Sequence, residues 1–406
     1  MPVRGHRKSQ DAWADRCRGG SETTYSPGGK AVLVPSACPN PSASRFKATN
    51  TKSGCPLLLA WQPAMRLPGT ASPWIMALRA GLRFVAVLQW EGPESKDNSQ
   101  PTSTRCRGYI PLANQGWKDS HDSIFHADGA LAAGPIALAE VQGYVYAARR
   151  AAAEIARRLG FGAEAEAFDA RAAALRVAFE AAFWCEGIGI YALALDGQKR
   201  PCRVRASNAG HLLLTGIAAP GHGKQVAAQL MSRPFFSGWG VRTLALGEAR
   251  YNPMSYHNGS VWPHDNAMIA RGMVRYGCRA EAARVFGAMF GACQANELRR
   301  LPELFCGFPR RRAQAPTDYP VACAPQAWAA TALLGMLQAC LGLSFDPARC
   351  LVRFTQPILP ESLDEVTLLN LEVGGACISV RLRRVGDEVA MNVLGRTGDI
   401  QAVLIS

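Results

Sequence analysis

The feature that most constrains this chain is a series of apolar, alanine-rich segments with helical periodicity. Pro135–Leu159 and Ala163–Phe183 repeat apolar side chains every three or four residues, which is the spacing of one face of an α-helix. Similar segments follow at Ser207–Ala218, Gly223–Met231, Trp262–Tyr276, Arg279–Ala295 and Pro325–Leu341. Long loops rich in Trp, Asn, His and charged residues separate them. The pattern predicts a mainly α fold, a toroid of helical hairpins of the (α/α)6 type, with functional side chains on the loops.

Three zones of different composition divide the 406 residues. Residues 1–110 are rich in Ser, Pro, Gly, Arg and Thr, and runs such as SACPNPSASRFKATNTKSGCP predict loop or low order, with one candidate helix at Ser72–Gln89. Residues 111–346 carry the helical segments. Residues 347–406 contain the segments VRFTQPILP, VTLLNLEV, ACISVRLRRV and EVAMNVLG, which predict a small antiparallel β-rich appendage.

The composition changes abruptly near Leu112. This indicates that residues 1–110 are an atypical segment not native to the domain, through a misplaced start, a frameshift or a truncated gene; ordinary disorder is the alternative. Seven helical segments are fewer than the twelve of six hairpins. We therefore expect the toroid to be incomplete on its N-terminal side.

The net charge of +14 is concentrated upstream. Residues 1–110 hold 15 Lys and Arg against 6 Asp and Glu, a net +9, so only +5 remains for the rest, and we do not infer nucleic-acid binding. Trp74–Trp90 is interrupted by Arg79 and Arg83, so no membrane span is expected. The oligomeric state stays unknown.

The 13 cysteines form no CxxC pair, and Cys185, Cys202, Cys278, Cys293, Cys323 and Cys340 lie mostly in apolar surroundings. The basic N-terminal stretch lacks the apolar core of a secretory signal. We therefore expect reduced, buried thiols and a cytoplasmic location.

The densest polar cluster, NQGWKDSHDSIFHADG (Asn114–Gly129), directly precedes the first long helix. Within it, Asp119 follows Trp117 and Lys118, which are both candidate substrate-binding residues. A tryptophan beside a carboxyl group favours the protonated form by desolvation and can stack on a sugar ring, which suits a general acid.

The other titratable residues of this cluster have simpler interpretations. For Asp122 and Asp128 we favour helix capping or loop hydrogen bonding over catalysis. His121 and His126 have no third ligand at a convincing spacing, so no metal site is expected.

A second cluster, SYHNGSVWPHDNAMIA (Ser255–Ala270), surrounds a proline at a helix start. A pyranose has an apolar face for stacking and hydroxyl groups for hydrogen bonding, and the aromatic, amide, imidazole and carboxylate groups here suit both. The candidate substrate-binding residues are Tyr256, His257, Asn258, Trp262, His264 and Asp265.

Three other segments carry weaker candidates for sugar contact. Glu140 and Tyr144 share one face of the first helix, and a core tyrosine with a solvated glutamate is an equal alternative. In the segment of Asn208 and His211, helix capping by Asn208 is the commoner explanation. In the segment of Trp239 and Arg242, the commoner explanation is a packed tryptophan. The candidates in these segments are Glu140 and Gln142, then Asn208 and His211, then Trp239 and Arg242.

Glu303 stands alone in an apolar run, RLPELFCGF (Arg300–Phe308). It is either a buried structural glutamate or a base that activates water opposite Asp119. Hydrolysis with inversion places two carboxyl groups roughly 6.5–9.5 Å apart, so that a water molecule fits between the base and the anomeric carbon.

Seven motifs, in order, resemble the glycogen-debranching amylo-α-1,6-glucosidases of the six-hairpin glycosidase superfamily, which includes glucoamylases and mannosylglycerate-hydrolase-like glycosidases. They are NQGWKDSHDSIFHADG, EVQGYVYAARRAA, SNAGHLL, FFSGWGVRTLA, YNPMSYHNGSVWPHDN, RLPELFCGF and CAPQAWAA, and they cover the chain from about Leu112. The resemblance implies cofactor-free, inverting cleavage of α-1,6-glucosidic bonds in an α-glucan or oligosaccharide. It assigns Asp119 as acid and Glu303 as base. It also implies sugar contacts by Trp117, His257, Trp262, His264 and Gln326.

Residues 1–110 do not resemble the β-rich N-terminal domain that usually precedes this region in the family. Two further interpretations therefore stay open. The chain is an inactive remnant that at most binds carbohydrate, or it is a related six-hairpin enzyme that acts on trehalose or a glycosyl-glycerate.

Overall fold

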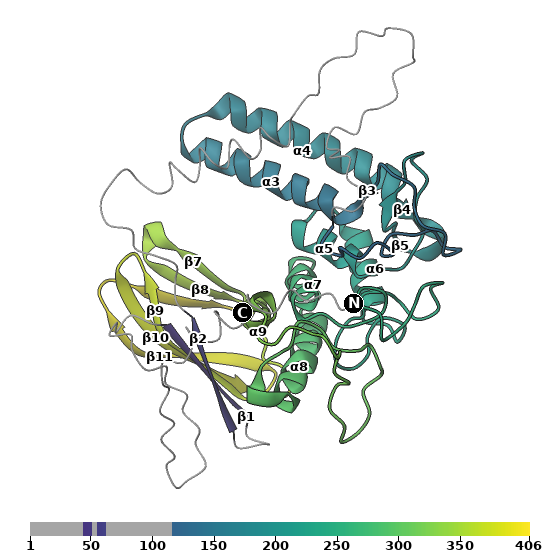
Figure 1. Cartoon of the computed structure of the whole chain (residues 1–406). Helices are drawn as coiled ribbons and strands as arrows, with labels where there is room; N and C mark the ends of the chain where they lie inside the picture. The colour runs from purple at the N-terminus through teal and green to yellow at the C-terminus, as the bar shows by residue number, and fades with distance from the viewer. Residues whose placement is uncertain (1–43, 51–54, 62–115) are drawn as a thin grey trace, which may run out of the picture. The chain divides into compact units, whose positions relative to one another are not determined.

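The computed structural model describes residues 44–50, 55–61 and 116–406 (Figure 1). These residues fall into two compact units. The helical unit comprises residues 116–344, 353–361 and 404–406, and the sheet unit comprises residues 44–50, 55–61, 345–352 and 362–403. The candidate helix at Ser72–Gln89 lies outside the described residues.

Each of the seven predicted helical segments forms a helix, which confirms the mainly α fold. The helices are α3 (Ala139–Arg158), α4 (Gly162–Phe183), α5 (Asn208–Thr215), α6 (Pro220–Leu230), α7 (Pro263–Arg275), α8 (Arg279–Ala295) and α9 (Ala327–Cys340). Short 3-10 helices lie at Glu186–Ile188, Glu297–Arg299 and Pro347–Arg349. Among the described residues, no helix combines the length and apolarity that crossing a bilayer requires.

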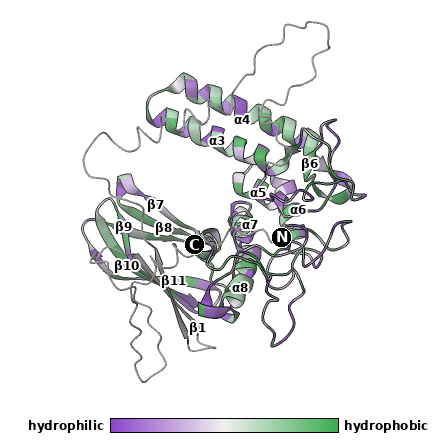
Figure 2. Cartoon of the chain, viewed as in Figure 1, coloured by the Kyte–Doolittle hydropathy of each residue, from purple (hydrophilic) through white to green (hydrophobic). Residues whose placement is uncertain are grey.

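The helices pack as successive hairpins. α3 packs on α4, α5 on α6 and α7 on α8, while α3, α5, α7 and α9 also pack on one another in order. Seven of the eight residues of α5 are buried, but only four of the 22 residues of α4. The odd-numbered helices therefore form the inner layer and the even-numbered helices the outer layer of this part of the toroid, and Figure 2 shows the mixed polarity of α4.

Two glycines set the close spacing of the inner layer. A Cβ atom at Gly143 of α3 would lie 2.7 Å from Oγ1 of Thr215 on α5. A Cβ atom at Gly272 of α7 would lie 2.6 Å from both Cβ of Leu213 and the backbone nitrogen of Leu214. Without a side chain at these positions, the backbones of α3 and α7 approach α5 closely.

The sheet unit contains a five-stranded sheet in the order β11–β10–β9–β1–β2, and its paired neighbours run antiparallel. The strands are β1 (Ser44–Asn50), β2 (Cys55–Trp61), β9 (Glu365–Val373), β10 (Ala376–Val385) and β11 (Glu388–Thr397). A second sheet has the order β12–β8–β7, formed by Gln401–Ile405, Leu351–Thr355 and Leu343–Asp346. Two-residue strands pair as β3 (Ala137–Leu138) with β6 (Ala194–Leu195) and as β4 (Trp184–Cys185) with β5 (Ile190–Tyr191). The four predicted C-terminal β-segments are thus confirmed.

Strands β1 and β2 correct the loop prediction for this part of residues 1–110. β1 pairs with β9, so that Arg45 lies opposite Leu369. The partner strand lies more than 300 residues away in the sequence, and a local pattern cannot reveal such a pairing because the hydrogen bonds are long-range.

The nine cysteines from Cys185 to Cys377 are free thiols. Cys185, Cys202, Cys293 and Cys340 are buried, as expected, whereas Cys323 is exposed. The apolar surroundings expected for Cys323 are therefore not present, because its segment is an exposed loop that precedes α9.

Candidate active site

The site is built where the N-terminal ends of the inner helices meet the preceding loops. Glu140 is the second residue of α3, Asn208 the first of α5 and His264 the second of α7, while Gln326 is the N-cap of α9. The N-terminal end of a helix carries partial positive charge, which favours carboxylates and polar ligands there.

Trp117 joins these elements through its ring. Its centroid lies 4.8 Å from the ring of His264, 5.5 Å from Trp262 and 5.6 Å from His257, each in an edge-on arrangement. It also stacks on His211 at 6.0 Å. Residues predicted from separate motifs are therefore brought into one aromatic cluster.

Lys118 is buried beneath this cluster and donates a hydrogen bond of 2.8 Å to the carbonyl oxygen of Thr243. Burial lowers the pKa of Lys118 to about 8, against the opposing charges of Asp265 and Glu140. Burial raises the pKa of Glu140, whose side chain has no exposed surface. Lys118, Asp265 and Glu140 therefore form a buried group of electrostatically coupled side chains.

A hydrogen-bonded chain links α3, α5 and α7. Oη of Tyr144 lies 2.5 Å from Nδ1 of His211, and Nε2 of His211 lies 2.7 Å from Oδ1 of Asp265. Burial raises the pKa of Tyr144 far above its usual range, so the phenol keeps its proton and donates to Nδ1. Burial alone raises the pKa of Asp265, but the hydrogen bond and charge of His211 outweigh burial, and the net shift is downward.

Several buried polar atoms of the site have no hydrogen-bond partner among the described residues. The nearby side chain of Asn208 lowers the pKa of Glu140, which burial raises. The Asn208 amide and the Glu140 carboxylate nevertheless do not meet the geometry of a hydrogen bond. The unpaired groups are both carboxylate oxygens of Glu140, the amide of Asn208, Oδ2 of Asp265, both ring nitrogens of His264 and Nε1 of Trp117. An unpaired buried polar group costs roughly 1–3 kcal/mol. Such a concentration of them fits a site that a polar ligand or water completes.

Asp119 lies at the rim, and 84% of its side chain is exposed. Oδ1 of Asp119 is 3.7 Å from Nε2 of His257, whose Nδ1 accepts a hydrogen bond of 3.3 Å from the backbone nitrogen of Ser120. Burial lowers the pKa of His257 to about 3, so the imidazole is neutral and directs its Nε2 proton to Asp119. The desolvation expected from Trp117 is absent, because the indole packs into the aromatic cluster and leaves the carboxylate in solvent.

Asp122, in the same loop, is half-buried. Its Oδ2 and its carbonyl oxygen both accept hydrogen bonds of 3.2 Å from Nδ2 of the buried Asn258. Oδ1 of Asp128 accepts a hydrogen bond of 2.9 Å from the backbone nitrogen of Ala130. The loop hydrogen bonding expected of both aspartates is present.

Glu303 is buried, with 6% of its surface exposed. Oε1 accepts a hydrogen bond of 2.7 Å from the hydroxyl of Tyr256, and Oε2 accepts one of 3.1 Å from the backbone nitrogen of Cys323. Burial raises the pKa of Tyr256, as do the hydrogen bond and charge of Glu303 and the charge of Asp119. The charges of both candidate carboxylates therefore raise the pKa of the same phenol.

Arg242 and Trp239, two predicted sugar-contact residues, make structural contacts instead. The buried guanidinium of Arg242 donates 2.6 Å from Nε to the carbonyl oxygen of Gly307, and from Nη1 to the carbonyl oxygens of Arg233, Pro234 and Phe235. The guanidinium of Arg310 lies over the buried ring of Trp239, with Cζ 4.2 Å from the ring centroid. Trp239 and Arg242 therefore have packing roles in this structure, which is the alternative expected for Trp239.

The two candidate glutamines bond the backbone nearby. Nε2 of Gln142 donates to the carbonyl oxygen of Leu138 at 3.3 Å, and Oε1 of Gln326 accepts from the nitrogen of Ala327 at 3.3 Å. Asn208 does not cap α5, because the N-cap position belongs to Ser207.

Trp328 is a site residue that sequence reasoning missed. Its ring stacks on His264 at 3.9 Å with an interplanar angle of 7°, and 39% of the residue is exposed. Its position in the CAPQAWAA motif, two residues after the N-cap of α9, is the signal that could have identified it.

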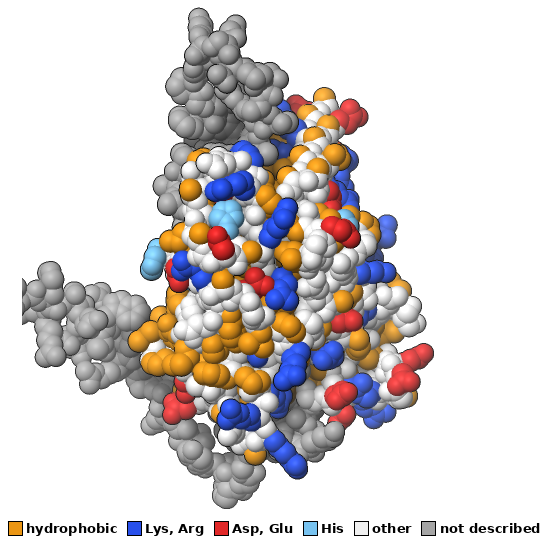
Figure 3. All heavy atoms as spheres, turned by 90° about the vertical axis from the view of Figure 1, so that its right-hand side faces the viewer, with side chains coloured by type: hydrophobic (Ala, Val, Ile, Leu, Met, Phe, Trp, Pro, Cys, Tyr) orange, Lys and Arg blue, Asp and Glu red, His pale blue; other side chains and the backbone are white. Residues whose placement is uncertain are grey.

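No group of three or more His, Cys, Asp or Glu side chains suited to a metal ion occurs in the described part of the chain. On the face drawn in Figure 3, basic and acidic side chains are interspersed with apolar ones.

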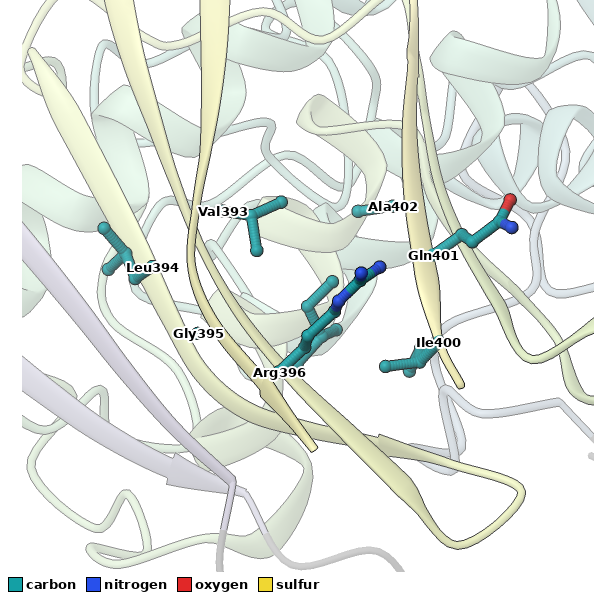
Figure 4. Close-up of a pocket in the computed structure, with 8 residues that line it drawn as sticks. Val393, Leu394, Gly395, Arg396, Ile400, Gln401 and Ala402 are labelled. Atoms are coloured by element: carbon teal, nitrogen blue, oxygen red, sulfur yellow. The ribbon is translucent and has the colours of Figure 1, made fainter. Parts of the chain in front are cut away.

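A hollow of about 470 Å³ lies in the sheet unit (Figure 4). Its lining comes from β10, β11 and the start of β12 and contains no carboxylate: Ile378, Val393, Leu394, Gly395, Arg396, Ile400, Gln401 and Ala402. The hollow therefore offers no acid–base pair.

The chain matches the model of a known family. The family described as the mannosylglycerate hydrolase MGH1-like glycoside hydrolase domain matches residues 60–307. The match begins inside residues 1–110 and ends after the segment that carries Glu303. None of the curated proteins matches the chain.

Solved structures with a similar fold include other glycosidases. A sialidase has a TM-score of 0.55 at 14% identity, over 79% of this chain and 29% of that one. The GH78 rhamnosidase of Bacillus sp. GL1 has a TM-score of 0.50 at 17% identity, over 66% and 26%. The GH63 mannosylglycerate hydrolase of Thermus thermophilus in complex with glucose has a TM-score of 0.40 at 20% identity, over 50% and 47%. This chain thus spans less than a third of the first two structures.

Proposed function

Because this chain belongs to the mannosylglycerate hydrolase MGH1-like family of glycoside hydrolases, which have the six-hairpin fold, we propose that it cleaves α-glucosidic bonds of the α-1,6 branch type with inversion. The observation that carries this proposal is the buried, doubly hydrogen-bonded carboxylate of Glu303. Its donor Tyr256 packs on His257, which contacts Asp119. The substrate is an α-glucan or oligosaccharide, and the reaction needs no cofactor.

Glu303 is the base. Its two hydrogen bonds hold the carboxylate in one orientation, which supports a fixed role in accepting a proton. Glu303 takes a proton from water as the water oxygen bonds to the anomeric carbon. The bond from that carbon to the leaving oxygen breaks, and this oxygen receives the proton of the acid.

Asp119 is the acid. Its Oδ1 lies 3.7 Å from Nε2 of His257, whose imidazole is neutral, so this contact is not an ion pair. A sugar bound over Trp117 would exclude the water that now surrounds Asp119. Asp122 is the second candidate in the loop, because Asn258 orients its half-buried carboxylate.

A comparison of leaving groups separates the two aspartates. Fluoride departs without protonation, so the variant that lacks the acid should lose hydrolysis of α-1,6-linked oligosaccharides but keep that of α-glucosyl fluoride. We expect this pattern from Asp119→Asn, and Glu303→Gln should lose both activities. The same pattern from Asp122→Asn, with Asp119→Asn fully active, would transfer the role to Asp122. Full activity of Glu303→Gln would overturn the mechanism.

The sugar ring is held by stacking and by the unpaired polar atoms. The half-buried Trp117 presents aromatic surface, and the buried rings of Trp262 and His264 pack against its edge. Glu140, Asn208 and Asp265 offer hydrogen-bonding atoms suited to hydroxyl groups. Inversion is tested by proton NMR of the first product formed from an α-glucoside, which should be the β-anomer.

A glycosyl-glycerate is the second candidate substrate, since the description of the matching family names mannosylglycerate hydrolase. Isomaltose-type α-1,6 oligosaccharides, trehalose, mannosylglycerate and glucosylglycerate, assayed side by side, distinguish these substrates. A cooperative melting transition together with turnover of any of them rules out an inactive remnant. The buried free thiols support a cytoplasmic location.

A further inference from the structure

The hydroxyl group of Tyr256 donates a hydrogen bond to the buried carboxylate of Glu303. The phenol donates to Oε1 at 2.7 Å, and the other donor is the backbone nitrogen of Cys323, at 3.1 Å from Oε2. Each oxygen therefore has one fixed donor and keeps a lone pair for another partner.

The surroundings of Tyr256 fix its hydroxyl group in place. Its carbonyl oxygen accepts from Nε1 of Trp262 at 2.9 Å and from Oγ of Ser260 at 2.6 Å. Its ring lies 4.9 Å from that of Trp262 and 5.7 Å from that of Tyr319. Backbone and ring are thus both anchored, so little rotational freedom is lost when the hydroxyl meets the carboxylate.

The phenol keeps its proton. Burial, followed by the hydrogen bond and charge of Glu303, raises the pKa of Tyr256 above its usual range. Throughout neutral and mildly alkaline pH it is therefore a donor, and a donor to a carboxylate stabilises the ionised form, which is the form that a base requires.

We infer that Tyr256 is a positioning residue for the base: its hydroxyl holds the ionised carboxylate of Glu303 so that a free lone pair faces the attacking water. This inference rests on the proposed function of Glu303. The sequence motif offered Tyr256 for sugar contact, whereas the structure directs its hydroxyl to the carboxylate.

The test compares Tyr256→Phe with Tyr251→Phe in the full chain. The hydroxyl of Tyr251 is a matched control, because it lies in the same loop and donates to the carbonyl oxygen of Gly307 at 3.5 Å, with no recorded contact to Glu303. A hydrogen bond to a charged group corresponds to about 10- to 100-fold in rate, so kcat of Tyr256→Phe should fall by about that factor with KM nearly unchanged. The acid limb of its pH–rate profile should move up by about one pH unit, because the ionised carboxylate loses a donor.

A second comparison separates positioning from loss of structure. In a Glu303→Gln background the enzyme has no carboxylate to position, so adding Tyr256→Phe should lower the residual rate by less than about twofold. A wild-type kcat and acid limb in Tyr256→Phe, with Glu303→Gln inactive, would overturn the inference alone. Full activity of Glu303→Gln would instead overturn the proposed function. An equal loss of rate on adding Tyr256→Phe in both backgrounds would also contradict positioning, since the effect would then not pass through Glu303.

Discussion

Nε2 of His211 lies 2.7 Å from Oδ1 of Asp265, and neither side chain has exposed surface. This contact joins α5 to α7 directly beneath the aromatic cluster. Breaking a buried hydrogen-bonded pair lowers the stability of the fold, mainly because the remaining partner is left buried without a partner. The charge of Asp265 also raises the pKa of the buried Lys118.

Asp265→Asn should therefore lower the free energy of unfolding by about 3 kcal/mol at pH 7. Urea denaturation monitored by circular dichroism measures this value. Asp128→Asn is the control, because that side chain is exposed and its amide oxygen can still accept from Ala130. Equal stability of the two variants would show that the buried pair is dispensable.

His264 predicts a specific dependence of stability on pH. Burial lowers the pKa of His264 from 6.5 to about 4, so between these values the unfolded chain binds a proton that the folded chain does not. The free energy of unfolding must then decrease as the pH falls from 6.5 to 4. His264→Gln removes this proton uptake and should flatten the decrease, measured by denaturation at several pH values. The exposed His121, changed to Gln, should leave the slope as it is.

The space around two helical glycines predicts opposite effects of replacing them with alanine. Gly272→Ala places a methyl group 2.6 Å from the backbone nitrogen of Leu214, and should destabilise the fold by about 1–3 kcal/mol. At Gly335 in α9, the nearest atom to an added Cβ is Cδ of Arg271 at 3.8 Å. Gly335→Ala should stabilise the protein by about 0.5–1 kcal/mol through helix propensity. Thermal melting of both variants decides this, and a stable Gly272→Ala protein would contradict the packing.

Arg242 distinguishes a structural role from the sugar contact that the motif suggested. Because its guanidinium bonds four backbone carbonyl oxygens, Arg242→Lys should lower the free energy of unfolding by about 1.5–3 kcal/mol. The KM of the folded variant should stay near that of the wild type. A rise in KM of about tenfold with unchanged stability would restore the direct contact with substrate. Arg312→Lys, at an exposed position, is the control.

The sequence alone determined the helices of this protein and which motifs carry its chemistry. Apolar spacing in segments such as Ala163–Phe183 is a local property, and the observed α4 begins within one residue of the predicted start. Aromatic and amide-rich loops identified Trp117, His257 and His264, which the structure joins in one cluster.

Only the tertiary structure decided what each polar group faces. It left Asp119 exposed, directed the hydroxyl of Tyr256 to Glu303 and buried Arg242 among carbonyl oxygens. It also paired β1 with β9. These outcomes depend on contacts between residues far apart in the chain. Hydrogen bonding and desolvation are set by such neighbours, and neither the type of a residue nor its local spacing specifies them.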